Sequence, residues 1–275
     1  MADLFVTDLD GTLLNAKSLV SKESQSLLKP LIEQGVQFTI ATARTHATAV
    51  ELLDGLELKL PIIVMNGVGL YQMSTREYEE IIGISDETLT TCLSLIKKAQ
   101  VQPLVYRIEE NELFVFYETI VNAPTDDFYQ SRKNKTLKKF IRVEAIELCL
   151  GRGEAVNMLA FDRTDILLPL VEKLQQLEDI TVTCYELEQF EGYSYFELYS
   201  RKASKANGIK SLCRHVSYDH LVVFGDNLND VPMFLEADEA YATQNAVASL
   251  KEIATDVIGH HDEEAVARYL AKRLK

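Results

Sequence analysis

The chain has 275 residues, which is enough for one large domain or two of ordinary size. Hydrophobic residues make up 47% of it and charged residues 25%, a composition typical of soluble globular proteins. The formal net charge of -14 argues against a nucleic-acid backbone or an anionic membrane as the main partner. It does not argue against a small anionic substrate, because a local cationic site can outweigh the field of the whole chain.

The sequence also bears on the cellular compartment. Its four cysteines lie far apart without a C-x-x-C pair, so we expect reduced thiols rather than a zinc or redox site. Asp3 and Asp8 interrupt any apolar signal segment, and no apolar stretch approaches the ~20 residues that span a bilayer. These features predict a cytoplasmic protein, monomer or homodimer, without a nucleic-acid or membrane partner.

The first 80 residues alternate between short apolar runs and helical patterns. The expected elements are a strand at 4–7, a helix capped by Ser21 and ended by Gly35, a strand at 36–41, a helix at 45–53 and a strand at 61–65. Continuously apolar strands separated by helices indicate a parallel sheet covered on both faces. Asn66 and Gly67 then give a turn signal that leads into a short hairpin.

The pattern changes between residues 84 and 188. The expected elements are a helix capped by Asp86, strands at 104–108 and 113–117, a basic polar segment at 132–139, a strand at 155–161, a helix at 164–177 and a strand at 180–185. Hairpin-like strands with one helix per pair predict an α+β module with a mostly antiparallel sheet. The basic segment is read as a solvated face, with contact to an anionic substrate as the alternative.

From residue 189 the first pattern returns. We expect strands at 195–199 and 221–224 and helices at 205–215 and 262–274, the last capped by Asp262. A segment that interrupts an α/β pattern, after which the same pattern resumes, indicates an inserted domain. The predicted organisation is therefore an α/β core at 1–83 and 189–275, with an α+β insertion at 84–188.

The pentapeptide Asp8-Leu9-Asp10-Gly11-Thr12 follows the first apolar run. Two carboxylates this close raise one another's pKa unless a cation lies between them. Mg²⁺ takes hard oxygen ligands and would relieve that repulsion. Ligands of open α/β sheets bind at the carboxyl ends of the strands, which is where this loop is expected. Taken alone, the motif fits an Asp-Gly turn equally well.

A second acidic loop, Gly225–Asp230, follows the apolar run at 221–224 and repeats this arrangement. If the two strands are neighbours, the loops bring together the carboxylates of Asp8, Asp10, Asp226 and Asp230. Such a set, with room for water, makes a magnesium site. Alone, this loop fits an Asx-rich turn that caps a helix.

Two further residues favour an anion site at the same edge. Thr42 ends the strand at 36–41, and a hydroxyl beside the free N–H groups of a turn binds anions. Lys205 opens a helix whose N-terminus is expected to point at the carboxylates. Neither is specific alone, because threonine commonly caps helices and most lysines are exposed. The pair His260 and His261 is set aside as a metal site, because adjacent side chains do not share a face of regular structure.

In this order, the motifs resemble those of the haloacid-dehalogenase superfamily, and more closely its Cof-type branch (subfamily IIB). The matching positions are Asp8-x-Asp10-Gly11-Thr12, Thr42, Lys205 and Gly225-Asp226-x-x-Asn229-Asp230, with Ile40–Arg44 and Met65–Gly67 similar to that branch's own motifs. The resemblance covers about residues 3–82 and 190–265 and is weak in the insertion. It implies a Rossmann-like core with an inserted cap of the C2B type. Ala43 departs from the family pattern, which has glycine there, and would be strained if the position needs a positive φ.

The resemblance also implies roles for residues of this chain. Asp8 would attack the phosphorus of a phosphomonoester, and Asp10 would act as general acid and then base. Mg²⁺ would be held by Asp8, the Asp10 carbonyl and Asp226. The groups implied to hold the phosphoryl oxygens are Lys205, Thr42, Asn229 and the N–H groups of Leu9 and Ala43. Asp230 would bind Mg²⁺ through water or position Lys205.

The resulting hypothesis is a Mg²⁺-dependent phosphatase of small phosphorylated metabolites, with sugar phosphates as the first guess. One alternative is a phosphosugar mutase, because an aspartyl-phosphate can return its phosphoryl group to a sugar. The other alternative is a non-catalytic protein that binds a phosphorylated metabolite and acts in regulation. A pure binder has no need of both carboxylates in the first loop, which argues against it.

Overall fold

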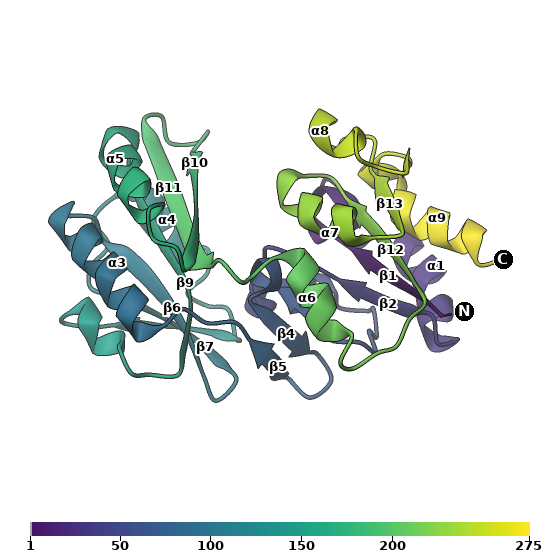
Figure 1. The fold of residues 1–275 in the computed structure, drawn as a ribbon, viewed down its shortest axis with the longest axis horizontal. Helices are drawn as coiled ribbons and strands as arrows, with labels where there is room; N and C mark the ends of the chain where they lie inside the picture. Colours follow the sequence, from purple (N-terminus) through teal and green to yellow (C-terminus); the bar gives the residue numbers. More distant parts are fainter. Residues whose placement is uncertain (1) are drawn as a thin grey trace. The chain divides into compact units, whose positions relative to one another are not determined.

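The computed structural model describes residues 2–275, which form two compact units (Figure 1). The first unit contains the chain up to Glu80 and the segment Ser204–Lys275, and the second contains Ile81–Ala203. The first unit is therefore discontinuous in sequence, and the second is inserted into it. No helix among the described residues is long and apolar enough to cross a bilayer.

A parallel sheet is the centre of the first unit. Its strands are β14 (Asp256–Val257), β13 (Glu239–Ala242), β12 (His220–Gly225), β1 (Asp3–Thr7) and β2 (Gln37–Ile40), in this spatial order. A parallel bridge between Ala41 and Ile63 places β3 (Ile62–Val64) beside β2, and β3 continues into β4 (Gly69–Gln72) and β5 (Glu77–Ile81). The predicted α/β core with a parallel sheet is confirmed.

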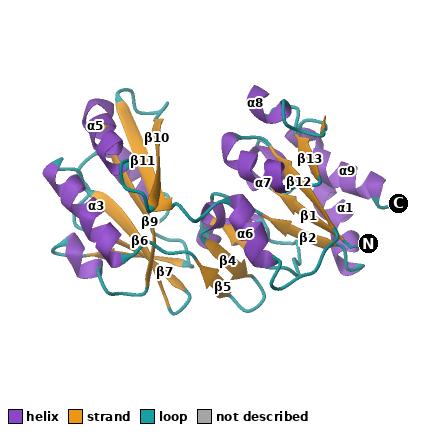
Figure 2. Ribbon diagram, in the orientation of Figure 1, coloured by secondary structure: helices purple, strands orange, loops and turns teal. Residues whose placement is uncertain are grey.

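Helices lie on both faces of this sheet (Figure 2). They are α1 (Lys22–Glu33), α2 (His46–Leu52), α6 (Lys205–Leu212), α7 (Val231–Glu236), α8 (Ala248–Lys251) and α9 (Ala265–Arg273). Leu4 and Val6 of β1 pack in one core cluster with residues of α6 and α7. On the other face, the ring of Phe224 contacts Tyr269 of α9. Because both faces are covered, the central strands β1 and β12 are buried except at their first residues.

The second unit is built on a six-stranded sheet. Its strands are β10 (Ile180–Glu186), β11 (Tyr193–Ser200), β9 (Glu154–Arg163), β6 (Pro103–Glu109), β7 (Glu112–Tyr117) and β8 (Lys138–Arg142), in this spatial order. All adjacent pairs are antiparallel except β7 and β8. The helices α3 (Asp86–Lys98) and α5 (Thr164–Leu174) share a core with one face. The helix α4 (Ala123–Gln130) contacts the other face, where Phe128 meets Phe161.

Several predicted boundaries need correction. The strand expected at 195–199 in the core is β11, which pairs with β9 and β10 in the second unit, so the insertion extends to Ala203 rather than to 188. Its antiparallel pairing is a long-range feature that an apolar run does not reveal. The cap of α3 is Ser85 rather than Asp86, since the Ser85 hydroxyl accepts a hydrogen bond from the Thr88 N–H. Asp262 does not cap α9, because its carboxylate accepts the N–H of Ala16.

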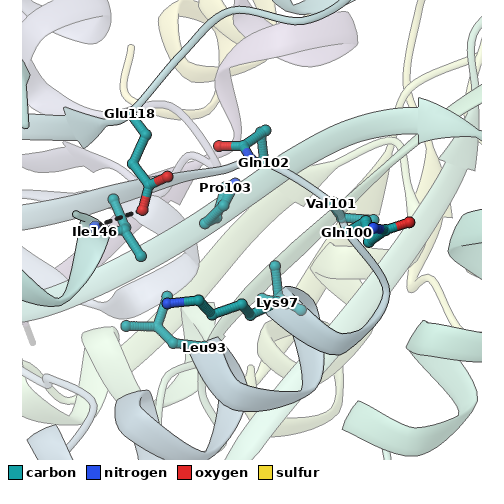
Figure 3. Close-up of a pocket in the computed structure, with 9 residues that line it drawn as sticks. Leu93, Lys97, Gln100, Val101, Gln102, Pro103, Glu118 and Ile146 are labelled. Atoms are coloured by element: carbon teal, nitrogen blue, oxygen red, sulfur yellow. Dashed lines mark hydrogen bonds between the residues drawn. The ribbon is translucent and has the colours of Figure 1, made fainter. Parts of the chain in front are cut away.

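A small hollow of about 100 Å³ lies where α3 leads into β6 (Figure 3). Its charged groups already have partners within the second unit. The Lys97 ammonium contacts the Glu147 carboxylate at 2.9 Å, and the Glu118 carboxylate accepts the Ile146 N–H at 2.7 Å. The hollow therefore offers no charged group in need of a ligand.

Candidate active site

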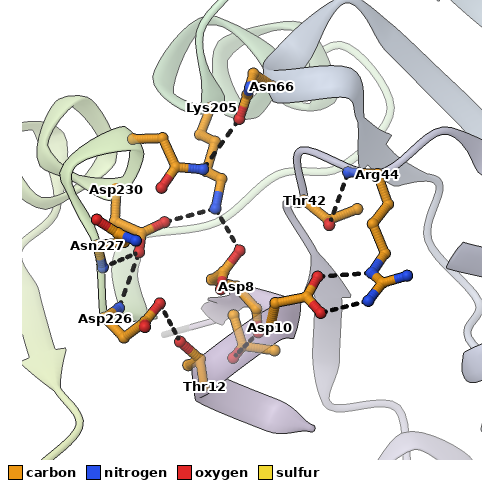
Figure 4. Close-up of polar contacts among 12 residues, drawn as sticks. Asp8, Asp10, Thr12, Thr42, Arg44, Asn66, Lys205, Asp226, Asn227 and Asp230 are labelled. Atoms are coloured by element: carbon orange, nitrogen blue, oxygen red, sulfur yellow. Dashed lines mark hydrogen bonds and ion pairs between the residues drawn. The ribbon is translucent and has the colours of Figure 1, made fainter. Parts of the chain in front are cut away.

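The two acidic loops meet because β1 and β12 are neighbouring parallel strands. Thr7 is paired with Phe224, and the Asp8 N–H donates to the Phe224 carbonyl at 2.9 Å. One loop leaves each strand at its carboxyl end. Carboxylate oxygens of Asp8, Asp226 and Asp230 consequently lie within 4.8 Å of one another (Figure 4).

Two glycines leave room for the carboxyl groups of this cluster. Gly11 has φ +74°, and a Cβ there would collide with the Asp226 carboxylate. A Cβ on Gly225 would lie 2.6 Å from the Asp230 carboxyl carbon. Glycine at position 11 therefore lets the two loops approach each other, and glycine at position 225 leaves room for the Asp230 carboxyl group within the second loop. The Thr12 hydroxyl donates across the loops to Asp226 at 3.4 Å, a contact that the sequence analysis did not assign.

Lys205 provides the positive charge of this cluster. Its side chain is fully buried, and its ammonium donates to Asp8 and, at 2.6 Å, to Asp230. The residue opens α6, whose cap is Ser204. This helix start lies close against the turn at 65–67, since a Cβ on Gly67 would collide with the Ser204 carbonyl. Lys205, which was expected to open a helix whose N-terminus points at the carboxylates, begins α6, and its side chain contacts two of these carboxylates.

Burial and crowding shift the pKa values of these groups. Burial raises the pKa of Asp8 to about 8, helped by the charges of Asp230 and Asp226 and opposed by Lys205. Burial and the Asp230 charge raise the pKa of Asp226 to about 6. Burial alone would lower the pKa of Lys205, but Asp8 and Asp230 outweigh it and raise that pKa. The cluster thus holds more negative charge than one lysine neutralises.

The carboxylate of Asp230 is already fully engaged. One oxygen accepts from Lys205, and the other accepts the N–H groups of Asp226 and Asn227 at 2.9 and 3.0 Å. Asp230 is completely buried. Its contacts fix both the lysine and the start of the second loop.

Asp10 lies apart from the carboxylate cluster. Its two oxygens accept a paired hydrogen bond from the Arg44 guanidinium, each at 2.6 Å, and about half of its side chain is exposed. The hydrogen bond from Asp10 raises the pKa of Arg44. Sequence reasoning gave Arg44 no role, although the residue stands in the motif that follows β2. Arg44 and Asp10 are 34 residues apart in the chain, and no local sequence pattern predicts a contact over that separation.

The remaining predicted phosphate ligands lie on turns beside these loops. Thr42 is buried, and its hydroxyl accepts the Arg44 N–H at 3.1 Å. Ala43 is exposed and does not have a positive φ, so alanine causes no backbone strain there. The Asn229 amide donates to Asn66 at 3.1 Å, a partner that sequence reasoning treated only as a turn residue. Leu9 is buried directly after Asp8.

The donor set fits a hard divalent cation. Asp8 and Asp226 offer carboxylate oxygens as ligands. The pKa values of both carboxyl groups are raised, because the groups are buried beside other negative charges. Mg²⁺ favours such oxygen ligands and keeps several waters. A second cluster, His260, His261 and Asp262, also has its donor atoms within 4.8 Å. There, however, His261 Nδ1 lies 2.7 Å from the Leu14 carbonyl oxygen, and His260 Nδ1 accepts the Asp262 N–H.

Curated relatives cover nearly the whole chain. A phosphatase of Bacillus subtilis, 5-amino-6-(5-phospho-D-ribitylamino)uracil phosphatase YwtE, is 26% identical over 283 residues, covering 97% of this chain and 96% of that protein. Phosphatase YwpJ of the same organism is 26% identical over 297 residues, covering 97% of this chain and 98% of that protein.

Solved structures show the same fold. A haloacid dehalogenase-like hydrolase from Bacteroides thetaiotaomicron has a TM-score of 0.81 at 21% identity, with both chains fully covered. TM0651 from Thermotoga maritima has a TM-score of 0.80 at 23% identity, covering 100% of this chain and 98% of that chain. The family model for haloacid dehalogenase-like hydrolases matches residues 5–270. The chain therefore belongs to the haloacid dehalogenase-like hydrolases.

Proposed function

We propose that this hydrolase is a Mg²⁺-dependent phosphatase that acts on small phosphorylated metabolites in the cytoplasm. The observation that carries the proposal is the buried contact of Lys205 with Asp8 and Asp230, directly beside Asp226. A carboxylate held by a fixed ammonium at the end of a parallel strand is a positioned nucleophile. Family membership and the phosphatase names of the relatives support the same reaction class.

Asp8 is the proposed nucleophile. Attack of its carboxylate on phosphorus forms an aspartyl-phosphate and releases the alcohol, and water then cleaves this intermediate. Lys205 holds the carboxylate and offsets the negative charge that the phosphoryl group brings. Asp230 positions Lys205 in this scheme, because both of its oxygens are already engaged.

Asp10 is the proposed general acid and base. It would protonate the departing alkoxide and then take a proton from the attacking water. Its exposed carboxylate is held by Arg44, so proton transfer requires Asp10 to exchange this partner for the substrate. Arg44 is therefore a positioning residue for Asp10.

The phosphoryl oxygens are assigned to donors on the neighbouring turns. These are the Thr42 hydroxyl, the Asn229 amide and the backbone N–H groups of Leu9 and Ala43, together with Lys205. Preorganised donors of this kind stabilise charge as it develops in the transition state. Asp8, the Asp10 carbonyl and Asp226 are the proposed ligands of Mg²⁺, which supplies charge neutralisation between carboxylate and phosphate when bound.

A panel of phosphomonoesters, assayed with and without Mg²⁺, tests this function. It includes sugar phosphates, pyridoxal phosphate, nucleotides and the ribitylaminouracil phosphate for which one relative is named. We expect Mg²⁺-dependent release of free phosphate from at least one small ester. An isomerised sugar phosphate in place of free phosphate would instead indicate a mutase, and no turnover of any ester would indicate a binding protein.

The nucleophile is tested by Asp8→Asn, with Asp54→Asn as the matched control on an exposed residue of the same unit. We expect Asp8→Asn to abolish phosphate release while the protein stays folded, and Asp54→Asn to retain full activity. Retained turnover in folded Asp8→Asn would refute the assignment.

A further inference from the structure

The hollow beside the end of α3 is lined by a residue with an unpaired polar atom (Figure 3). Gln102, which leads directly into β6, lines it, and the side-chain oxygen of this residue is buried. Among residues 2–275, no donor lies within hydrogen-bond distance of that oxygen. An acceptor in this position has given up its hydrogen bonds to water without gaining one from the protein, which costs free energy.

The size and the walls of the hollow suit a small molecule with an apolar body. Its volume of about 100 Å³ is roughly the liquid volume of three water molecules. Five of the nine residues that line it are apolar: Leu93, Ile96, Val101, Pro103 and Ile146. Water against such walls is held weakly, so an apolar body that displaces it gains free energy.

The charged groups of the lining favour an uncharged ligand. The Lys97 ammonium pairs with Glu147, which raises the pKa of Lys97 and lowers that of Glu147, so both groups stay charged and paired at neutral pH. A charged ligand would lose its hydration in a mostly apolar hollow. An anion would in addition meet the Glu118 carboxylate and the Gln102 oxygen. The Gln102 oxygen calls for a donor, and a neutral donor meets this need at the least cost.

We propose that this hollow binds a small neutral molecule that carries a hydroxyl or amide N–H donor on a compact apolar body. The donor forms a hydrogen bond with the Gln102 oxygen, and the apolar body packs against Ile96 and Ile146. All the lining residues belong to the second unit, whereas the proposed catalytic residues belong to the first. The inference therefore does not rest on the proposed phosphatase function.

NMR titration of the full chain tests the site. The donor probes are 2-propanol and acetamide, and acetone is the matched probe, with a similar size and shape but without a donor. We expect a donor probe to bind with a dissociation constant on the order of millimolar and to shift the methyl signals of Ile96 and Ile146. It should bind about tenfold more tightly than acetone, because one hydrogen bond is added. The tighter of the two donor probes identifies the preferred group.

Gln102→Leu removes the acceptor at similar side-chain size. We expect this variant to bind the donor probes no more tightly than acetone. It should also resist urea at least as well as the control, because no hydrogen bond within the protein is lost. The control is Gln176→Leu, which changes an exposed glutamine of the same unit and should bind like the unmodified protein.

Four results would overturn the proposal. They are the absence of a shift with any probe, acetone binding as tight as that of the donor probes, tighter binding of isopropylammonium than of either donor probe, and a Gln102→Leu protein less stable than the control. The last result would show that water already satisfies the Gln102 oxygen. None of these measurements involves turnover, so they stand apart from the test of the phosphatase function.

Discussion

Lys205 is the residue on which the charge balance of the carboxylate cluster depends. It is fully buried and is the partner of both Asp8 and Asp230. Removing one member of a buried ion pair leaves an uncompensated charge, which is more costly than never having formed the pair. Stability and catalysis should therefore both respond to this side chain.

We expect Lys205→Met to lower the free energy of unfolding by about 3 kcal/mol. We also expect phosphate release to fall by about 100-fold or more, because the charge beside the nucleophile is lost. Urea denaturation and a phosphate-release assay measure the two effects. Lys210→Met is the control, since this lysine lies on the same helix but pairs with Glu236 at the surface. A Lys205→Met protein as stable and active as the control would contradict the assigned role.

The raised pKa values of Asp8 and Asp226 make magnesium binding sensitive to pH. With a pKa of about 8, Asp8 retains its proton in the neutral range in the metal-free protein, and Asp226, with a pKa of about 6, is partly protonated near pH 6. A cation must displace those protons, so its affinity rises as the pH increases from 6 to 8. Calorimetry in buffers of different ionisation enthalpy should detect proton release on Mg²⁺ binding. Affinity that is independent of pH would contradict this expectation.

At the scale of elements, one network attaches the C-terminal helix α9 to the sheet. Arg273 donates to both oxygens of Glu239 on β13, at 2.6 and 2.9 Å, and to Asp3 on β1 at 3.3 Å. The Arg273 hydrogen bonds, with those of Tyr241 and His220, lower the pKa of Glu239 to about 2. The Glu239 carboxylate therefore contacts side chains of α9, β12 and β13, and Arg273 extends the network to Asp3 on β1.

This network predicts a particular acid sensitivity. Because the pKa of Glu239 is lower in the folded state than its ordinary value of 4.5, its contribution to stability is present above pH 4.5 and is lost as the pH falls towards 2. Arg273→Met should lower the free energy of unfolding by about 1 kcal/mol at pH 7, because the ion pair with Glu239 is partly solvated. The loss should be smaller near pH 3. Urea denaturation at the two pH values measures the difference. An equal loss at both would exclude the ion pair as the cause.

Elements with a local signal could be predicted from sequence. The strands β1 and β12 are short apolar runs followed by acidic loops, and their pairing brings Asp8 and Asp226 together as expected. The sequence analysis did not predict α4 or the strand β8, which begins with two lysines and whose pairing with β7 is a tertiary feature. The contact between Arg44 and Asp10 also depends on side-chain direction, about which residue spacing carries little information.

At the scale of the whole molecule, each unit has its own hydrophobic core. In the second unit, α3 and α5 pack on the sheet through residues that all belong to Ile81–Ala203. The first unit closes its core from two separate chain segments. A unit whose core is continuous in sequence meets the main requirement for folding alone.

We therefore expect the segment Ile81–Ala203, produced by itself, to fold into its sheet and to unfold cooperatively on heating. It should not release phosphate, because all the proposed catalytic residues belong to the first unit. Circular dichroism and a phosphate-release assay test both expectations. A segment without a cooperative thermal transition would show that its core is incomplete without the rest of the chain.

The junction at the end of the second unit has a consequence for exchanging the inserted segment between relatives. Ala203 is the last residue of the insertion, Ser204 caps α6 and Lys205 follows at once. A donor segment joined even one residue late would replace Ser204, which caps this helix. The Lys205 ammonium would then lose the helix start that positions it. Replacement between Ile81 and Ala203 leaves that start intact. The N-cap of α6 thus sets the last position at which a foreign segment can be joined. A recombined chain that keeps this cap retains the Lys205 position while its inserted unit is replaced.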